Sequence, residues 1–536
     1  MHRNKSVSTH QFAMIPRSEV PRSAFQREST YKTTLDAGYL YPFYVDECLP
    51  GDSFNYKATM FGRLATPIVP IMDNLYIDTF FFFVPNRLVW TNWVKMMGEQ
   101  DNPGDTISYV MPTMISPVAG YVPLTIFDYL GLPTVGQVSA GETVDHISLP
   151  LRAYNLIWNQ WFRDENLQNS VVVNKGDTAD LYTDYTLLKR GKRKDYFTGC
   201  LPWPQKGAAV TLPLGTSAPL VSSGATIAMT AGSAGVRTLT GTATTNAVTL
   251  SGTALASGQS LTYGVAGTPV VGMYADLSAA TAATVNQLRQ SFQIQKLLER
   301  DARGGTRYTE LMRSHFGVNS PDSRLQRPEY LGGGSTPITV SPIAQTSNTP
   351  VSGTPQGNLA AMGTLLARGH GFNYSCVEHG YILGLCSVRA DLTYQQGLRK
   401  MWSRSTRYDF YWPEFAMLGE QAVLNKEIYC TGNSAQDDLV FGYQERWAEY
   451  RYFPSQITGY FKSTTATPID IWHLAQKFTS LPTLNSTFIQ ENPPISRIVA
   501  VGAGANGQQF LLDVFQSIRT VRPLPMYSVP GLIDHF

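Results

Sequence analysis

One glycine-rich run has the spacing of a dinucleotide-binding loop. Gly502, Gly504 and Gly507 fit the pattern G-x-G-x-x-G and follow the apolar run 498–501. A nucleotide site of this type needs a helix next, so that its N-terminus meets the pyrophosphate, and an acidic residue about 20 residues later. A strand-like run, 509–519, follows instead. The pattern therefore predicts a hairpin turn, and we expect no cofactor.

Thiol and imidazole side chains gather in one stretch that could be drawn as a zinc site. They are His370, Cys376, His379 and Cys386. Their spacing lacks the close Cys or His pairs that bring two ligands to one ion, so we expect core thiols and ordinary histidines. The chain has five cysteines, which are odd in number and widely spaced. This pattern predicts buried free thiols in a reducing cytoplasm. The five are Cys48, Cys200, Cys376, Cys386 and Cys430.

The adjacent carboxylates Asp437 and Asp438 could contribute to a calcium site at a subunit contact, although a solvated turn explains them more simply. No nucleophile elbow, H-E-x-x-H, Walker loop or kinase signature occurs in the sequence. The sequence therefore predicts a protein that is not an enzyme, with no catalytic, cofactor-binding or metal-binding residues.

Two basic segments could contact nucleic acid, since lysine and arginine bind phosphates without regard to base sequence. The first is a cluster that comprises Lys189, Arg190, Lys192, Arg193 and Lys194. The second is a polar N-terminal arm, 1–36, with the basic residues Arg3, Lys5, Arg17, Arg22, Arg27 and Lys32. We expect the arm to lie over a neighbour or over packaged cargo, and a disordered terminus is the alternative. For the cluster, the alternative is a solvated loop that faces outward or pairs with a neighbour's acidic residues.

The composition indicates a surface with few charges. Charged residues make up 15% of the 536 residues, with 45 glycines, 33 prolines and 12% aromatics, whereas a typical soluble domain has about 25% charged residues. Such a low charge density suits a surface that copies of the same chain cover. The longest apolar run near the start, 80–84, is far shorter than the roughly 18 residues of a membrane span, so no membrane insertion is expected.

Strand patterns dominate the chain. Alternation of apolar and polar residues in 53–60 and continuous apolarity in 75–84 predict strands. Further candidate strands are 338–343, 380–390, 456–462, 497–502 and 509–519. Short helices are expected at 86–98, 154–161, 285–303 and 308–315. Strands joined by long loops that carry isolated helices predict a mainly β, elaborated antiparallel sandwich.

The segment 207–275 is unusual because Arg237 is its one charged residue among 69. Its threonine and valine content predicts small β hairpins in an inserted, projecting subdomain, with a flexible low-complexity loop as the alternative. The candidate contact residues of this projection are Arg237, Thr238, Thr240, Thr242 and Asn246. A second stretch, 332–364, is rich in Gly, Ser, Thr and Pro and resembles a loop.

Long segments of the chain resemble the major capsid protein of microviruses, specifically of the gokushovirus branch. The resemblance rests on FYVDECLP at 43–50 with the following residues to Trp90, on YFTGCLPWPQKG at 196–207, and on 298–317, 320–333, 409–429, 441–460 and 518–532. The resemblance implies an eight-stranded antiparallel jelly roll of the viral capsid type, with long loop insertions that carry short helices. In such a chain 1–36 would be the arm, 37–206 and 284–536 two parts of the core, and 207–283 a spike.

The resemblance also implies an assembly and its partners. Sixty copies would enclose a circular single-stranded DNA in a T=1 icosahedral bacteriophage virion, assembled in the bacterial cytoplasm, with spikes at the threefold axes. The implied partners are a small basic DNA-binding protein, a DNA-pilot protein, an internal scaffolding protein and a host cell-surface receptor. A formal charge of +2 per copy is far too small to neutralise the phosphates of a genome that encodes this chain, so cations or a basic protein must do so.

Two other classes of protein share parts of this pattern. A monomeric jelly-roll lectin or adhesin would have the same fold class and threonine-rich loops. A glycan-cleaving enzyme on a β scaffold would need paired carboxylates in a cleft, and no motif in the sequence points to such a pair.

Overall fold

The computed structural model describes residues 21–210, 285–318, 326–347, 356–500 and 508–527, and the backbone of five short strands between 220 and 275. The chain forms two compact units. The larger unit contains Met1–Pro204 and Ala302–Phe536, and the smaller unit contains Gln205–Asp301. Within the described residues, no helix combines the length and apolarity that a bilayer span requires.

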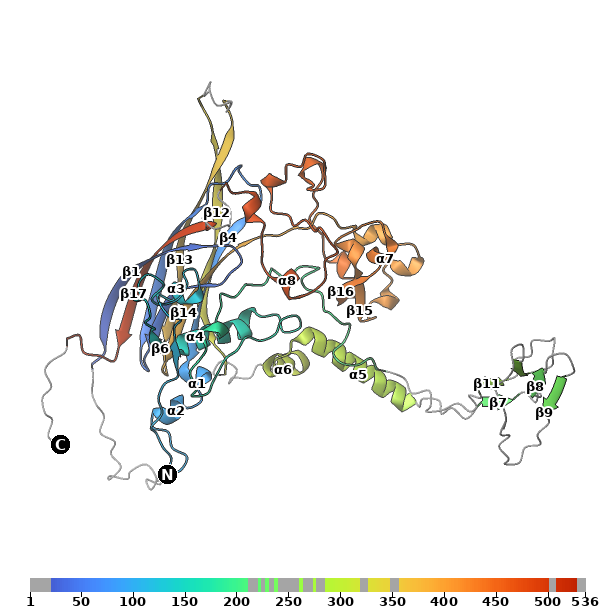
Figure 1. Ribbon diagram of the computed structural model, residues 1–536, viewed down its shortest axis with the longest axis horizontal. Helices are drawn as coiled ribbons and strands as arrows, with labels where there is room; N and C mark the ends of the chain where they lie inside the picture. The colour runs from blue at the N-terminus through green and yellow to red at the C-terminus, as the bar shows by residue number, and fades with distance from the viewer. Residues whose placement is uncertain are drawn as a thin grey trace, which may run out of the picture. The chain divides into compact units, whose positions relative to one another are not determined.

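The larger unit is built on an antiparallel sheet of eight strands in the order β1-β17-β3-β13-β12-β4-β14-β2 (Figure 1). These strands are β1 (Ser23–Leu35), β2 (Tyr41–Cys48), β3 (Ser53–Leu64), β4 (Leu75–Pro85), β12 (Glu329–Ala344), β13 (Leu359–Ser375), β14 (Gly380–Ala390) and β17 (Phe510–Arg522). The expected mainly β fold and eight-stranded antiparallel arrangement are confirmed.

The long hairpin of β12 and β13 joins two faces of the sheet. The first part of β12 pairs with β4 up to Ile338, and the part from Thr339 onward pairs with β13. Beyond Thr364, β13 turns to β3. The sheet therefore has one face of β1, β17, β3 and β13 and another of β12, β4, β14 and β2, as in a jelly-roll sandwich.

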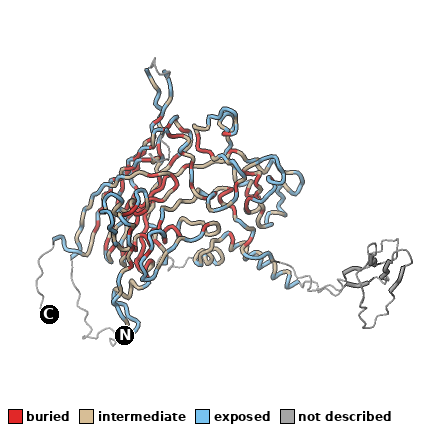
Figure 2. The backbone as a smooth tube through the Cα atoms, in the orientation of Figure 1, coloured by how far each residue is buried: buried red, intermediate tan, exposed pale blue. Residues whose placement is uncertain are grey.

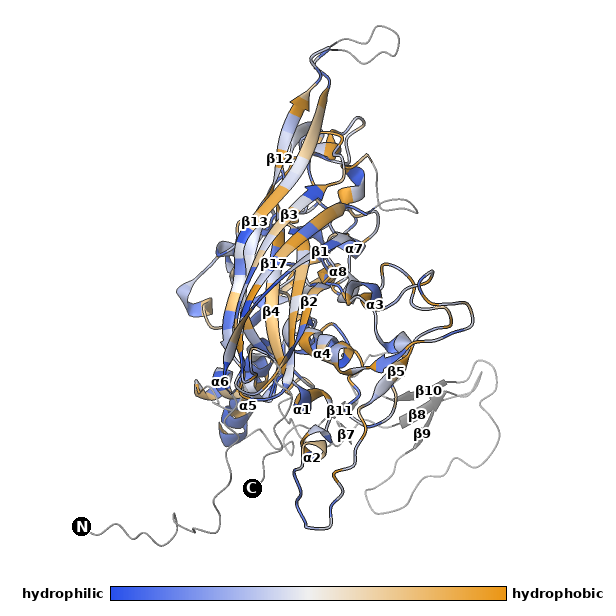
Figure 3. Ribbon diagram, turned by 90° about the vertical axis from the view of Figure 1, so that its left-hand side faces the viewer, coloured by the Kyte–Doolittle hydropathy of each residue, from blue (hydrophilic) through white to orange (hydrophobic). Residues whose placement is uncertain are grey.

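A core of aromatic and aliphatic side chains fills the space between the two faces, where Figure 2 shows most of the buried backbone. Phe81 of β4 is fully buried, and its ring lies 4.9 Å from that of Tyr56, 5.1 Å from Phe372 and 5.7 Å from Phe43. Along β3, buried and exposed residues alternate from Phe54 to Leu64. Figure 3 shows the same alternation of hydropathy along the long strands.

The sandwich is open between its edge strands β1 and β2, and side chains close this seam. Arg27 donates to Asp46 at 2.5 Å, and Tyr31 donates to the backbone carbonyl of Pro42 at 3.4 Å. From β17, Gln516 donates to the carbonyl of Phe43 at 3.1 Å, and Arg522 donates to that of Glu47 at 2.9 Å. Polar side chains therefore stand in for the eighth set of strand hydrogen bonds, which would close the sheet.

The expected N-terminal arm is wrong over Ser23–Leu35, which forms β1 and pairs with β17 along its whole length. Residues 1–20 lie outside the described residues. The strand escaped sequence analysis because an edge strand with one exposed side carries polar residues at most positions. Its partner, β17, is more than 470 residues further along the chain.

Most other strand expectations are confirmed. The structure has strands at 53–60, 75–84, 338–343, 380–390 and over 510–519 of the last candidate. The strand expected at 456–462 is wrong, because only a 3-10 turn at Gly459–Phe461 forms there. At 497–502 the described residues form a 3-10 turn and one isolated bridge, so this expectation is also wrong.

The stretch 332–364 was expected to be a loop, and this expectation is wrong over 332–344 and 359–364, which belong to β12 and β13. The glycines of β12 permit close packing rather than a turn. A Cβ at Gly333 would lie 2.0 Å from the carbonyl oxygen of Thr79, and one at Gly334 would lie 2.6 Å from the His370 ring. Glycine is needed here because a neighbouring strand and a buried imidazole approach the backbone.

Short helices and small sheets form the long loops. The helix expected at 86–98 is two helices, α1 and α2, whereas 154–161 falls in α4 and the π-helical turn Trp158–Phe162 that follows it. The helices expected at 285–303 and 308–315 are confirmed. The elements are α1 (Asn86–Val89), α2 (Trp93–Met96), β5 (Thr113–Ile115), α3 (Ile126–Tyr129), β6 (Asp145–Ile147), α4 (Leu149–Ile157), α5 (Val285–Gly304), α6 (Tyr308–Phe316), β15 (Glu420–Leu424), α7 (Ser434–Asp437), β16 (Val440–Glu445) and α8 (Ser486–Ile489).

Two further apolar clusters attach these loops to the sheet. In the first, α1, α3 and α4 cover the outer side of β4 and β14, where Phe82 and Leu383 pack against Tyr154. In the second, β15 and β16 surround Phe197 and Phe488. The loop elements therefore have apolar cores of their own.

The expectation of five free thiols is wrong for two of them. Cys48 and Cys376 form a disulfide, with Cα atoms 6.4 Å apart. The backbone N–H of Cys376 donates to Asp52, and the N–H of Gly51 donates to Cys376, both at 2.8 Å, which brings the two loops together. Residues 328 positions apart cannot be paired from spacing alone. Cys200 and Cys386 are buried free thiols, and Cys430 is free and exposed.

The smaller unit contains α5 up to Asp301 and five short strands, of which β8 pairs antiparallel with both β9 and β10, and β7 with β11. The strands are β7 (Leu220–Ser222), β8 (Ile227–Thr230), β9 (Val236–Leu239), β10 (Ser260–Tyr263) and β11 (Met273–Ala275). Arg237 and Thr238 belong to β9, whereas Thr240, Thr242 and Asn246 lie outside the described residues.

Candidate assembly and nucleic-acid surfaces

The basic cluster at 189–194 is tied into the fold by its arginine at position 190. Arg190 Nη1 lies 2.5 Å from Asp78 Oδ2, and its guanidinium lies 4.8 Å from the centre of the Phe80 ring. Arg389 Nε approaches the same carboxylate at 3.0 Å. Burial opposes ionisation of Asp78, but hydrogen bonds from Ser335 and Arg190 outweigh it and lower the pKa of Asp78. Arg190 therefore serves an internal ion pair.

Lys192 is also turned inward. Its Nζ donates to Gln476 Oε1 at 2.9 Å and lies 4.3 Å from the centre of the Phe488 ring. Burial lowers the pKa of Lys192 to about 8. Nearby, burial raises the pKa of Glu491 to about 7, although the N–H of Ala390 and the charge of Lys192 act in the opposite direction. Lys192 thus interacts with groups of its own chain, Gln476, the Phe488 ring and the charge of Glu491.

The buried carboxyl of Glu491 makes stability depend on pH. A raised carboxyl pKa means that the folded state holds its proton more tightly, so stability falls as pH rises from about 4.5 to about 7. We expect Glu491→Gln to raise the free energy of unfolding by about 2–3 kcal/mol at pH 7.5 and to change it little at pH 5. Urea unfolding of unassembled subunits at both pH values measures this effect. The exposed Glu99→Gln is the control and should change stability little at either pH. Equal effects of Glu491→Gln at the two pH values would contradict a raised pKa of Glu491.

The three remaining basic residues of the cluster are more exposed. Lys189 donates to Asn492 at 3.1 Å and lies over the Tyr39 ring, and Arg193 pairs with Asp391 at 3.2 Å. Lys194 pairs with Asp164, and its side chain is 62% exposed. The cluster thus pairs largely with acids of its own chain, an alternative that sequence analysis did not consider. DNA contact by these residues stays a prediction.

A cavity of about 560 Å³ lies beside the cluster. Its lining combines the rings of Phe80, Phe82, Trp161 and Tyr330 with basic groups that include Lys194. A second basic lining residue, Arg307, is held by Glu165 at 2.5 Å and by Glu310 at 2.7 Å. Aromatic faces beside cationic groups can hold an unstacked base and its phosphate. Sequence analysis missed this aromatic wall, because its rings come from three separate segments.

The basic residues expected in the N-terminal arm have roles in the sheet where the structure describes them. Arg22 donates to the carbonyl of Gly51 at 2.6 Å and Arg27 closes the seam, whereas Lys32 forms an exposed pair with Asp513 at 2.6 Å. Arg3, Lys5 and Arg17 lie outside the described residues.

The side chains that resemble a zinc set are dispersed. His370 lies between the hydroxyls of Thr79 and Thr336, at 2.9 and 2.8 Å, and burial lowers its pKa. Cys376 is in the disulfide. Across the described residues, no group of three His, Cys, Asp or Glu side chains is placed to hold a metal ion. The glycine pattern at 502–507 lies outside the described residues.

Asp437 is buried, so the expected solvated turn is wrong for this residue. Its carboxylate accepts hydrogen bonds from the backbone N–H groups of Thr431 and Gly432, at 2.8 and 2.9 Å. The bond from Thr431 lowers the pKa of Asp437. Asp438 pairs with Lys426 at 2.8 Å. The two carboxylates thus stabilise the loop before β16 separately.

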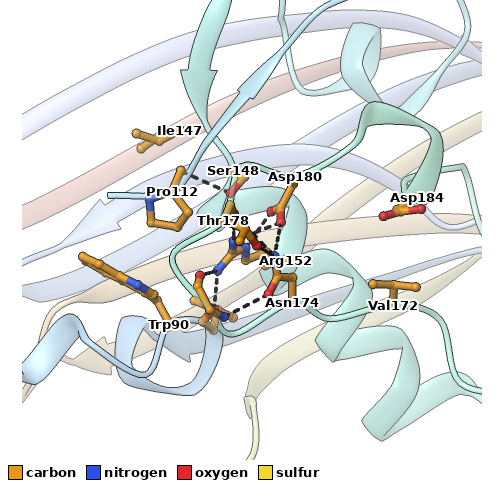
Figure 4. A network of polar contacts seen from close by, with 12 residues as sticks. Trp90, Pro112, Ile147, Ser148, Arg152, Val172, Asn174, Thr178, Asp180 and Asp184 are labelled. Atoms are coloured by element: carbon orange, nitrogen blue, oxygen red, sulfur yellow. Dashed lines mark hydrogen bonds and ion pairs between the residues drawn. The ribbon is translucent and has the colours of Figure 1, made fainter. Parts of the chain in front are cut away.

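A buried ion pair fixes the loops around α4 (Figure 4). The side chains of Arg152 and Asp180 are 0% and 2% exposed, and two guanidinium nitrogens donate to the carboxylate at 2.6 and 2.9 Å. The remaining donors reach the carbonyls of Val89, Gly176 and Thr178. Burial would raise the pKa of Asp180, but the hydrogen bond and charge of Arg152 lower it. This pair anchors α1 and the segment 172–185 to α4.

An eight-stranded jelly-roll sandwich with large, separately packed loops is a fold that viral coat proteins use. A family model described as Capsid protein (F protein) matches residues 13–532. The chain belongs to this family of capsid proteins, and the resemblance to microvirus coat proteins is confirmed.

Three capsid proteins show the extent of the similarity. The chain is 48% identical over 541 residues to capsid protein VP1 of Bdellovibrio phage phiMH2K, 43% identical over 599 residues to that of Chlamydia phage 1, and 35% identical over 550 residues to that of Spiroplasma virus 4. In each comparison 98% of both chains is covered. As a capsid protein the chain is a component of the virion that assembles with other copies.

Proposed function

We propose that sixty copies of this chain form a T=1 icosahedral shell around a single-stranded DNA bacteriophage genome. The similarity to phage capsid proteins along 98% of the chain carries the proposal. The jelly-roll sandwich and its extensive loops support it, because such loops supply contact surfaces between copies. Virions would form in the host cytoplasm, with a basic DNA-binding protein, a pilot protein and an internal scaffolding protein as partners.

Electron microscopy and light scattering of the expressed chain test this proposal, with and without the scaffolding and DNA-binding proteins of the same phage. Closed particles of uniform size that contain sixty copies are expected. A species that stays at one or a few subunits under every partner and salt condition would reject the proposal and favour a jelly-roll lectin or adhesin.

We further propose that Lys189, Arg193 and Lys194 contact DNA phosphates at the mouth of the aromatic cavity. The exposure of Arg193 and Lys194 and the place of Lys194 in the cavity lining support this. Replacement of all three by glutamine is expected to weaken binding of a single-stranded oligonucleotide. The slope of log K against log salt should fall by about 0.7 for each phosphate that the variant no longer binds. As a control, the exposed residues Lys57, Arg63 and Arg519 are replaced by glutamine, and an equally weakened binding in this variant would contradict the site.

The segment 207–283 is proposed as the host-facing spike, in which Arg237, Thr238, Thr240, Thr242 and Asn246 meet the receptor. Its nearly uncharged composition and its place in a separate compact unit support this role. Deletion of 207–275 is expected to leave particles intact and to abolish adsorption to host cells, as counted by residual free phage. Failure of particles to form would reject this division of labour.

A further inference from the structure

Two surfaces of the larger unit have opposite charge and expose large apolar side chains. The arginine–aromatic surface is formed by 396–418 and 446–462, which together contain seven basic and three acidic residues. The acidic surface is formed by 92–147, with six acidic residues and one basic residue. Sequence analysis missed both surfaces, although the excess of basic or acidic residues in these segments could have indicated them.

The arginine–aromatic surface has the composition of a binding surface. Met417 is 97% exposed, Phe453 75% and Trp402 69%. Soluble monomers rarely expose large apolar side chains in such density. Tyrosine, tryptophan and arginine are also the residues that most often dominate binding energy at protein interfaces.

The arginines of this surface stack on its rings. The guanidinium of Arg399 lies 4.4 Å from the centre of the Phe453 ring, that of Arg407 lies 5.3 Å from Trp412, and that of Arg446 lies 4.6 Å from Trp447. In the part of the chain that the structure describes, none of these three guanidiniums has a carboxylate within ion-pair distance. Stacking fixes the guanidinium planes and leaves N–H groups at their edges for an external acceptor.

The acidic surface supplies acceptors of the required kind. Glu99, Asp101 and Glu142 are exposed, and within the described residues none of them forms an ion pair. Between them lie apolar side chains with little cover, among them Val110 at 82% and Val118 at 63% exposure. This surface therefore matches the arginine–aromatic surface both in charge and in its capacity to bury apolar area.

The two surfaces lie apart within one chain. In Figure 1, α2 of the acidic surface lies below the sheet, whereas β15 and β16, beside the arginine–aromatic surface, lie to the right of the sheet. We propose that the arginine–aromatic surface of one copy binds the acidic surface of the next copy. A head-to-tail contact forms a ring when its rotation closes, and the vertices of an icosahedral shell require such rings. This inference rests on the proposed capsid function and adds the surfaces that make the contact.

A second copy fits this surface better than DNA does. Nucleic acid could stack on the rings, but Met417 and Leu418 are aliphatic and gain nothing from bases. These two side chains are stabilised by burial against a protein surface. The acidic surface would repel DNA, whereas in the proposed contact it is the partner of the arginine–aromatic surface.

Charge reversal tests the contact. We expect the triple variant Arg399→Glu, Arg407→Glu, Arg446→Glu, and separately Glu99→Lys, Asp101→Lys, Glu142→Lys, to lower particle yield at least about tenfold. The six changes combined in one chain restore opposite charges in each contact and should recover particles. Velocity sedimentation and electron microscopy measure particle yield, and circular dichroism of the subunits confirms folding.

The control reverses Lys57, Arg63 and Arg519 to glutamate, which gives the same change in net charge on an exposed face of β3 and β17. Wild-type yield in either triple variant, an equally reduced yield in the control, or no recovery in the sixfold variant would overturn the contact while leaving the capsid function standing. Loss of oligonucleotide binding without loss of empty particles in the arginine variant would assign the surface to DNA instead. Absence of particles from the wild-type chain itself would refute the proposed function.

Discussion

Replacement of Arg152 by methionine is expected to lower the free energy of unfolding of the isolated subunit by about 3–5 kcal/mol. The methionine retains much of the apolar volume but leaves the carboxylate of Asp180 without its cation in a site from which water is excluded. The carbonyls of Val89, Gly176 and Thr178 lose donors as well. Urea unfolding at neutral pH, followed by tryptophan fluorescence, measures the effect.

The loss of unfolding free energy in the Arg152→Met variant depends on pH. Because the pKa of Asp180 is lowered in the fold, its contribution to stability is present above the unfolded pKa of about 3.9 and is lost as pH falls through the folded pKa. The difference between wild type and variant should therefore shrink below about pH 4. A difference that is constant with pH would mean that poorer packing, rather than the missing ion pair, is responsible.

The exposed pair of Arg193 and Asp391 provides a matched control. Its side chains are 52% and 36% exposed, so Arg193→Met is expected to cost less than about 1 kcal/mol. If both arginine variants were destabilised equally, burial of the Arg152 pair would not be the cause. We expect particle yield to fall in the Arg152 variant only, since α1 and α4 support the acidic surface.

Replacement of Phe81 by alanine is the second change with a large expected effect, again about 3–5 kcal/mol. The ring is fully buried and contacts Tyr56 and Phe372 of the opposite face as well as Phe43 of its own face, so it joins β4 to the strands β3 and β13. Its removal leaves a cavity that long, hydrogen-bonded strands cannot collapse to fill. Urea unfolding of the subunit measures the decrease in stability.

Phe61→Ala on β3 is the control for this change. Phe61 has the same side chain on the same sheet, but it points away from the core and is 50% exposed. We expect its replacement to change stability by less than about 1 kcal/mol. Equal destabilisation of the two variants would show that the outer face of the sheet is as tightly packed as the interior, contrary to the structure.

The Phe81 variant and a charge-reversed variant together separate stability from assembly. A subunit weakened at Phe81 should still form particles at low temperature, because none of its contact surfaces is altered. A subunit with reversed charges at Arg399 and Arg407 should be as stable as the wild type and fail to assemble. This contrast follows from the position of the core between the sheet faces and of the contact surfaces on the loops.

The local sequence determined several of the core strands and the longer helices, but not β1 or the parts of β12 and β13 within 332–337 and 359–364. Alternation in 53–64 and apolarity in 75–85 require a half-buried and a fully buried strand, whatever their partners. Gly317, with a φ of +71°, ends α6 just beyond the helix expected at 308–315. Similarity along the whole chain determined the class of protein. The strand patterns and the helix end depend on residues within a few positions of one another, so a single sequence displays them.

The tertiary structure alone decided which distant groups meet. Cys48 bonds to Cys376, β1 joins β17, and the arginine at position 190 is neutralised by Asp78. The basic cluster was recognisable as a cluster, but its sequence carries no sign that two of its side chains point into the fold. Contacts between residues a hundred or more positions apart depend on the packing of the whole sandwich, and local periodicity carries no information about that packing.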